Sequence, residues 1–251
     1  MKIIVGIVGC GFVGGALKRW LEEYNADNVE LLISDPPKGF NDNMETADVI
    51  FISIHVPTED DGSQDLTLVK QIISTLPDKP IFIRTTVLPG TSDKLSHEFK
   101  KRIYFMPEFL TERTAYEDFC SQTMVFTGEF ELLKNIFPEK QLIEMTSLEA
   151  EITKYAHNVF GALKVTYFNG IFDICSRLNV NYQKVLEGIL ASEYINSTHT
   201  QVPGPDGYFG YGGKCFPKDV NAFIKQFEDY PIYDLLKEMN SLNRIFRGND
   251  L

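Results

Sequence analysis

The chain has 251 residues, of which 43% are hydrophobic and 24% charged, as expected for a globular protein with a large buried core. Its formal net charge of -11 argues against nucleic acid or an anionic membrane as the main partner, so an anionic substrate would need a local cluster of Lys and Arg. The four cysteines are far apart and form no metal-type pattern with the four histidines, so we expect reduced thiols, no metal and a cytoplasmic location.

The N-terminal segment follows the order strand, glycine fingerprint, helix, strand, acid. An apolar run at 2–8 predicts a buried parallel strand, a helical period follows at 16–21, and a second strand at 30–35 ends in an aspartate. In this motif the glycines allow a tight turn and close approach of a pyrophosphate, and the acid accepts hydrogen bonds from ribose hydroxyls. The predicted NAD site therefore contains Gly9, Gly11, Phe12, Val13, Gly14 and Asp35.

The carboxylate of Asp35 favours NAD over NADP because it would repel a 2′-phosphate. Asp35 can also be interpreted as a turn residue at a strand end.

Further strands alternate with helices after this motif. The strands are expected at 48–56, 80–86, 102–106 and 124–127, and the helices between them at 66–76 and 92–99. This alternation predicts an α/β fold of the Rossmann type, with a doubly wound parallel sheet over residues 1–146.

Polar residues and prolines cluster where three of these strands end, at 55–58, 85–91 and 107–112. Each cluster alone is compatible with an ordinary βα turn, in which Thr, Pro and Gly are common. Because ligands bind at the carboxyl ends of parallel strands, three clusters on one rim favour a binding site.

The remainder, 147–251, predicts an all-helical domain built on a long central helix. A capping box at Thr146 begins this helix, which we expect to run to about residue 179. Lys154 and Asn158 are four residues apart and share a face of it. The helix carries more aromatic and aliphatic side chains than one face can bury, so we expect a homodimer through 147–179 or a central place in the domain.

Cys215 follows a glycine-rich stretch and precedes helix-forming sequence. Three glycines at 210, 212 and 213 allow the backbone to approach a ligand, and 196–207 is an irregular segment of the kind that covers one. Lys214 and Lys218 flank the cysteine, and ammonium groups and a helix N-terminus both favour a reactive thiolate. The alternative is a glycine turn with a small buried thiol.

Six segments, in this order, resemble the nucleotide-sugar dehydrogenase family: GFVG at 11–14, VPT at 56–58, TTVLPGT at 85–91, PEFL at 107–110, AEITKYAHN at 150–158 and YGGKCFPKD at 211–219. The resemblance implies an NAD-binding sheet domain, a helical middle domain that dimerises, and oxidation of a sugar primary alcohol to a uronic acid by two NAD. The expected substrate is UDP-glucose or a close relative.

The resemblance also implies roles for individual residues. Cys215 matches the family nucleophile, which forms a thiohemiacetal and then a thioester, while Lys154 and Asn158 match the pair that stabilises oxyanions. Glu108 and Asp219 match carboxylates that activate water and move protons, and Thr86 matches a threonine that holds this water. Further cofactor contacts are expected from Val56, Pro57, Thr58, Thr86, Glu112 and Lys218. Substrate contacts are expected from Glu108, Phe109, Leu110, Lys154, Asn158, Tyr208, Phe209, Gly210, Tyr211 and Gly212.

The family also carries a second Rossmann-like domain that grips the substrate diphosphate, and this chain stops at Leu251, before such a domain could begin. One alternative is therefore an NAD-binding, catalytically incomplete homologue with a regulatory or assembly role. Another is a hydroxyacid dehydrogenase of the same sheet-plus-helix plan, which would need no cysteine.

Overall fold

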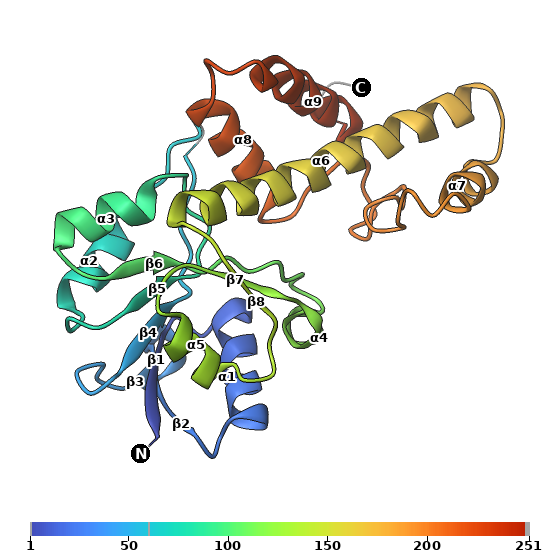
Figure 1. The fold of residues 1–251 in the computed structure, drawn as a ribbon. Coiled ribbons are helices and arrows are strands. Elements are labelled where there is room, and N and C mark those ends of the chain that lie inside the picture. The colour runs from blue at the N-terminus through green and yellow to red at the C-terminus, as the bar shows by residue number, and fades with distance from the viewer. Residues whose placement is uncertain (1, 60, 249–251) are drawn as a thin grey trace. The chain divides into compact units, whose positions relative to one another are not determined.

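The computed structural model describes residues 2–59 and 61–248, which divide into two compact units. The first unit comprises Met1–Pro57 and Gln64–Lys154, and the second comprises Thr58–Ser63 and Tyr155–Leu251. One helix of 31 residues, α6 (Ser147–Arg177), contributes residues to both units (Figure 1).

The first unit alternates strands with helices. In chain order its elements are β1 (Ile3–Val8), α1 (Phe12–Tyr24), β2 (Val29–Asp35), the 3-10 helix η1 (Pro36–Lys38), β3 (Phe40–Asn41), β4 (Val49–Ile52), α2 (Thr67–Thr75), β5 (Ile81–Ile83), α3 (Thr91–Phe99), β6 (Ile103–Phe105), α4 (Ala115–Ser121), β7 (Met124–Phe126), α5 (Phe130–Ile136) and β8 (Leu142–Glu144).

The main sheet has the strand order β3-β2-β1-β4-β5-β6. All neighbours in it are parallel except the short edge strand β3, which is antiparallel to β2. After β2 the chain crosses to the other side of β1 and adds β4, so the strand order reverses between β1 and β4. In doubly wound sheets the ligand crevice lies at the carboxyl ends of the strands at this reversal, which is where the glycine fingerprint follows β1.

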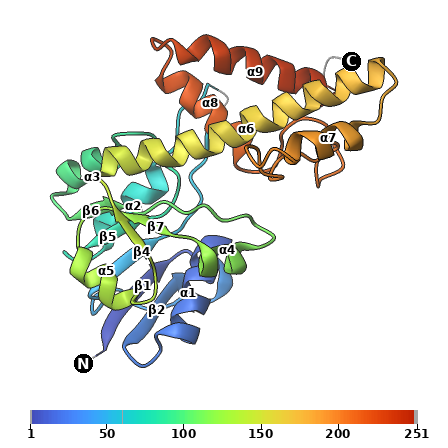
Figure 2. The ribbon, with the colours of Figure 1, turned by 45° about the vertical axis from the view of Figure 1, so that its right-hand side comes forward.

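Both faces of this sheet are covered, because successive strand residues point to opposite sides. On β4, Val49 and Phe51 pack with residues of α1, α4 and α5, whereas Ile50 and Ile52 pack with residues of α2 and α3. Figure 2 shows these helices around the sheet. The continuous apolar strands are thus buried on two sides, as their sequence predicts.

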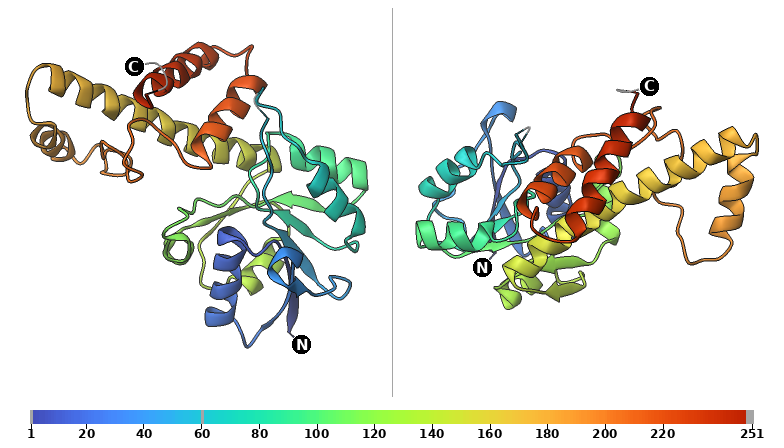
Figure 3. Two further views of the ribbon diagram at one scale, coloured as in Figure 1. Left: turned by 180° about the vertical axis from the view of Figure 1, so that it is seen from behind. Right: turned by 90° about the horizontal axis from the view of Figure 1, so that it is seen from above.

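The second unit is helical. It contains most of α6 together with α7 (Tyr182–Leu190), α8 (Phe216–Gln226) and α9 (Ile232–Phe246) (Figure 3). Phe168 and Cys175 of α6 pack against Tyr182 and Leu186 of α7. Segment 58–63 also belongs to this unit, because Gly62 (φ +87°) lies so close to α8 that an added Cβ would be 2.6 Å from the Asn221 carbonyl oxygen.

The predicted fold class is confirmed: a doubly wound, mainly parallel sheet is followed by helices built on a long central helix. The strands after β2 are shorter than predicted, and Met124–Phe126 pairs with β8 in a separate two-stranded parallel sheet instead of joining the main one. Across residues 2–59 and 61–248, no helix combines the length and apolarity needed to span a bilayer.

Candidate active site

The fingerprint loop between β1 and α1 has the backbone geometry that its glycines predict. Gly9 adopts φ +87°, and a Cβ at Gly14 would be 2.0 Å from the Gly9 carbonyl oxygen, so neither position accommodates a side chain. Gly11 differs, since nothing lies within 4 Å of a Cβ added there. It is the N-cap of α1, whose N-terminus has no side-chain cap and no acidic residue in its first turn.

These features fit a bound dinucleotide. The uncapped N–H groups of α1 and the open space at Gly11 are suited to a pyrophosphate. Beside Gly14, the Ser53 hydroxyl is buried with no hydrogen-bond partner within the described part of the chain, which leaves a polar group available to a ligand.

Asp35 lies next to this loop at the end of β2. Its Oδ2 accepts a hydrogen bond from the backbone N–H of Cys10 (2.8 Å), so the predicted ribose-binding acid also shapes the fingerprint. Lys38, which the sequence analysis did not single out, donates to the Cys10 carbonyl oxygen (2.6 Å) and lies 3.9 Å from Asp35 Oδ2.

A buried ion pair joins Lys154 and Glu108 within the first unit. Lys154 Nζ lies 3.0 Å from Glu108 Oε1 and donates to the Glu108 carbonyl oxygen at 2.5 Å, and both side chains are less than 8% exposed. The other carboxylate oxygen accepts from the Leu110 N–H at 2.7 Å. The predicted cation and carboxylate are thus held in fixed orientations away from water.

Arg84, at the end of β5, adds a second buried cation near Glu108. Its side chain is fully buried, with the guanidinium 5.3 Å from the Phe119 ring. Burial lowers the pKa of Arg84 to about 10, while the charge of Glu108 acts in the opposite direction. A single arginine in a sequence is usually interpreted as a solvated surface charge, so no sequence signal marked this one.

A second polar pair lies in the helical unit. Asn158 Nδ2 donates to Asp219 Oδ2 at 2.6 Å, and the other oxygen of Asp219 lies 2.5 Å from Lys218 Nζ. Asp219 is fully buried and Asn158 is 5% exposed. The ammonium of Lys218, which the sequence predicts to favour the thiolate or to contact the cofactor, is paired with Asp219.

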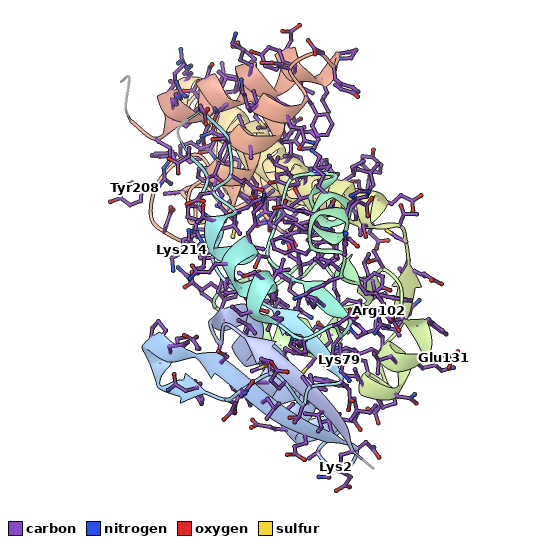
Figure 4. All side chains as sticks on the ribbon, turned by 90° about the vertical axis from the view of Figure 1, so that its left-hand side faces the viewer. Lys2, Lys79, Arg102, Glu131, Tyr208 and Lys214 are labelled. Atoms are coloured by element: carbon purple, nitrogen blue, oxygen red, sulfur yellow. The ribbon has the colours of Figure 1, made fainter. Side chains whose placement is uncertain are left out.

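Cys215 is the N-cap of α8, and its carbonyl oxygen accepts from the Asp219 N–H at 2.9 Å. The cysteine is half-buried, and the predicted position at a helix N-terminus is confirmed. Figure 4 shows Tyr208 and Lys214, which precede it, with side chains that point outward.

The other residues predicted to contact ligands differ widely in exposure. Val56, Thr86 and Tyr211 are buried, and Tyr208 is 61% exposed. The segment from Gly210 to Gly212 contacts side chains of α6 and α9, residues that the sequence analysis did not identify. Among the predicted site residues, the first unit brings together Lys154 and Glu108, and the second brings together Asn158, Asp219 and Lys218.

Comparison with family models matches most of the chain. Residues 21–137 match the NAD binding domain of the UDP-glucose/GDP-mannose dehydrogenase family, and residues 148–244 match the central domain of the same family. The first of these matches contains Asp35 and the second contains Cys215.

Individual relatives support the same relationship. The chain is 30% identical over 220 residues to UDP-glucose 6-dehydrogenase of Rhizobium meliloti, which covers 76% of this chain and 49% of that protein. It is 31% identical over 236 residues to GDP-mannose 6-dehydrogenase of Pseudomonas aeruginosa, at 82% and 53% coverage. The chain therefore spans about half the length of the curated relatives it matches.

Solved structures share the fold. A UDP-glucose dehydrogenase from Pyrobaculum islandicum has a TM-score of 0.75 at 23% identity, covering 96% of this chain and 68% of that one. The 3-hydroxyisobutyrate dehydrogenase of Mycobacterium tuberculosis has a TM-score of 0.70 at 15% identity, covering 98% and 95%. At these identities the likeness concerns architecture alone.

Proposed function

Because the chain belongs to the UDP-glucose/GDP-mannose dehydrogenase family, we propose that it catalyses the NAD-dependent oxidation of a nucleotide sugar, with UDP-glucose as the first candidate. The reaction converts a primary alcohol to a carboxylate. The observation that carries the proposal is the set of buried donor–carboxylate pairs, Lys154–Glu108 and Asn158–Asp219, in a chain that also places Cys215 at the N-terminus of α8.

The fingerprint residues Gly9, Gly11 and Gly14 and the N-terminus of α1 would hold the cofactor pyrophosphate, and Asp35 would accept hydrogen bonds from a ribose. When bound, NAD accepts a hydride from the carbon that is oxidised. Further contacts to the cofactor are proposed for Phe12, Val13, Val56, Pro57, Thr58, Thr86, Glu112 and Lys218.

Cys215 is proposed to act as the nucleophile. The first oxidation gives an aldehyde, to whose carbon the thiolate sulfur adds, forming a thiohemiacetal. Its oxidation gives a thioester, which water hydrolyses to the carboxylate and the free thiol. The alcohol, two NAD⁺ and one water thus yield a carboxylate, two NADH and three protons. The N-terminus of α8 favours the thiolate form.

Lys154 and Asn158 are proposed to stabilise the oxyanions that form on the substrate. A cation and an amide N–H are effective donors when they are fixed in advance and shielded from water. Lys154 and Asn158 are 4% and 5% exposed, and their hydrogen bonds to Glu108 and Asp219 orient them. The two carboxylates are proposed to accept protons and activate water, with Thr86 holding that water.

A second copy of the chain is the proposed partner. Phe160, Tyr167 and Ile174 of α6 recur every seven residues, and they are 64%, 57% and 52% exposed. Leu178, just beyond the helix, is 69% exposed. A heptad stripe of exposed apolar side chains is typical of a helix that packs against another helix, and it supports a homodimer through residues 147–179.

The activity is tested by incubating the protein with NAD and a panel of UDP- and GDP-sugars while the formation of NADH is followed by its absorbance. We expect Cys215→Ser to lower formation of the carboxylate by about a thousandfold or more, because the thioester can no longer form. Cys120→Ser, at a half-buried cysteine of α4, is the matched control and should retain activity.

NAD binding without turnover of any sugar nucleotide would contradict the proposal. That result would favour an NAD-binding homologue with a regulatory or assembly role.

A further inference from the structure

Asn243 of α9 holds the backbone of the glycine-rich segment 206–213, which leads to Cys215. Its Oδ1 accepts a hydrogen bond from the Tyr211 N–H at 2.6 Å, and its Nδ2 donates to the Tyr211 carbonyl oxygen at 3.1 Å. The side chain of Asn243 is 7% exposed. One amide therefore satisfies both backbone groups of Tyr211, as a neighbouring strand would, in a segment that belongs to no sheet.

Arg247, directly after α9, contacts the same segment at three further points. Its Nη1 donates to Asp206 Oδ2 at 2.8 Å, and the guanidinium lies 5.1 Å from the centre of the Tyr208 ring. The guanidinium also lies against Gly212, where an added Cβ would be 2.6 Å from each terminal nitrogen.

Two of the glycines in this segment thus make room for protein side chains. A Cβ at Gly210 would lie 2.4 Å from Asn243 Oδ1, and one at Gly212 would meet Arg247. Gly210 also adopts φ +69°, and its N–H donates to Asn169 Oδ1 of α6 at 2.9 Å. Two helices therefore fix the segment.

The other side of Cys215 is fixed independently. α8 begins directly after the cysteine and is attached to α6 by the Asn158–Asp219 hydrogen bond and by stacking of Phe223 on Tyr155, with ring centres 5.6 Å apart. Cys215 is the junction between this anchored helix and segment 206–213. Movement of the segment would therefore be transmitted to the cysteine, whose position depends on both neighbours.

We infer that Asn243 and Arg247 are positioning residues that fix segment 206–213 and, through it, the place of the Cys215 thiol. Neither residue needs to touch a substrate or cofactor for this role. The inference rests on the proposed function only insofar as Cys215 is the nucleophile; the mechanical link itself is measurable without turnover.

The test uses Asn243→Ser and Arg247→Met in the full chain. Glu238→Gln and Arg244→Met are the matched controls, because they change exposed residues on the same helix and Arg244→Met removes the same charge as Arg247→Met. Two quantities are measured: hydrogen exchange of the amides in 207–214, and the alkylation rate of each cysteine by iodoacetamide, resolved by peptide mass spectrometry. Cys10, in the first unit, is the internal reference.

We expect the Tyr211 amide to exchange about tenfold faster in Asn243→Ser, because two hydrogen bonds are lost. The alkylation rate of Cys215 should change by about threefold or more in both variants while that of Cys10 stays constant, since thiol reactivity follows local exposure and charge. Both controls should behave as wild type. If Asn243→Ser does not fold, Arg247→Met decides the outcome, since its side chain is 25% exposed and removing it leaves no deep cavity.

Folded variants with unchanged exchange in 207–214 and unchanged alkylation of Cys215 would overturn the inference. A wild-type protein that forms no NADH but shows the expected changes would contradict the proposed function and leave the inference standing. If wild type is active, both variants should lose turnover but keep the wild-type affinity for NAD. A general loss of stability would lower both turnover and NAD binding.

Discussion

At the scale of single residues, buried charge is concentrated around Glu108. This one carboxylate serves Lys154, which is 4% exposed, and lies near Arg84, which is 1% exposed. The two cations are removed from water, so each depends on that carboxylate for compensation. The pKa of Arg84, lowered to about 10 by burial, reflects the same cost.

Glu108→Gln should therefore lower the free energy of unfolding by about 3–5 kcal/mol, the cost typical of breaking a buried ion pair from one side. Denaturant unfolding of both proteins at neutral pH measures the difference. Glu112→Gln, an exposed position in the same loop, is the control and should change it by less than about 0.5 kcal/mol. A small effect of Glu108→Gln would mean that the two cations are stabilised in another way.

The fingerprint glycines offer a second comparison at this scale. Gly14→Ala places a Cβ 2.0 Å from a backbone oxygen and should lower the unfolding temperature, whereas Gly11→Ala meets open space and should leave it unchanged. Because the open space is where the cofactor is proposed to lie, Gly11→Ala should weaken NAD binding about tenfold or more in calorimetric titration. Unchanged NAD affinity in Gly11→Ala would place the cofactor elsewhere.

Residue types and motif context drew attention to Cys215, Lys154 and Asp35, and the structure places them at the start of α8, against Glu108 and beside the fingerprint loop. Arg84, Asn243 and Arg247 stand in no pattern. Their roles come from burial and from contacts over long sequence separations, such as the one between Asn243 and Tyr211, and no local signal in a single sequence records these.

At the scale of secondary-structure elements, Glu151 of α6 caps a different helix. Its carboxylate accepts hydrogen bonds from the backbone N–H groups of Gly90 (2.6 Å) and Ser92 (2.8 Å) at the start of α3. The N-cap of α3 is Gly90, which has no side chain that could cap it. The N-terminal part of α6 is thereby fastened to α3 within the first unit.

Burial raises the pKa of Glu151 above its ordinary value of 4.5, although its hydrogen bonds oppose the shift. The folded state then binds this proton more readily than the unfolded state, so this contribution to stability is present at low pH and is lost as pH rises through the raised pKa. Wild type should therefore gain stability relative to Glu151→Gln as pH falls toward 4.5. The measured quantity is the free energy of unfolding of wild type minus that of the variant, which should increase.

Urea titrations from pH 7 to pH 4.5 measure this trend. Glu149→Gln is the control with the opposite sign, because hydrogen bonds from Thr146 lower the pKa of Glu149 and its contribution is lost as pH falls. Parallel curves for wild type and Glu151→Gln would show that Glu151 does not titrate in this range.

Element types were predictable from periodicity, and element ends were less so. The apolar run at 48–56 predicts one long strand, but β4 ends at Ile52, and Thr58–Ser63 belongs to the helical unit. α8 begins at Phe216, directly after Cys215, with Pro217 in its first turn, where proline needs no hydrogen-bonded N–H.

At the scale of the whole molecule, the exposed apolar residues along α6 predict a dimer that charged substitutions on this helix should disrupt. We expect wild type to sediment as a dimer and Phe160→Glu/Tyr167→Glu to sediment as a monomer, because the two carboxylates would have to be buried at the interface. Tyr194→Glu, at a side chain that is 90% exposed outside α6, is the control and should remain dimeric. A wild-type monomer at micromolar concentration would contradict the proposal.

The order of sheet followed by helices was predictable at this scale, because alternating strands and helices give way to one long helical period at Thr146. The sequence did not predict that 58–63 belongs to the helical unit. Six residues are too few to show a periodic pattern, and the close packing of Gly62 on α8 is visible only in the structure.

Because 58–63 belongs to the helical unit, the protein is difficult to divide into fragments. A fragment cut after Lys154 would retain 58–63 as an internal loop without the helices that it packs against, and a fragment 155–251 would expose the part of α8 that Gly62 covers. The two units are interleaved along the polypeptide, so scission at one peptide bond cannot release either of them intact. Producing the helical unit alone would require either 58–63 as a separate peptide or a rearranged gene that joins 58–63 to 155–251.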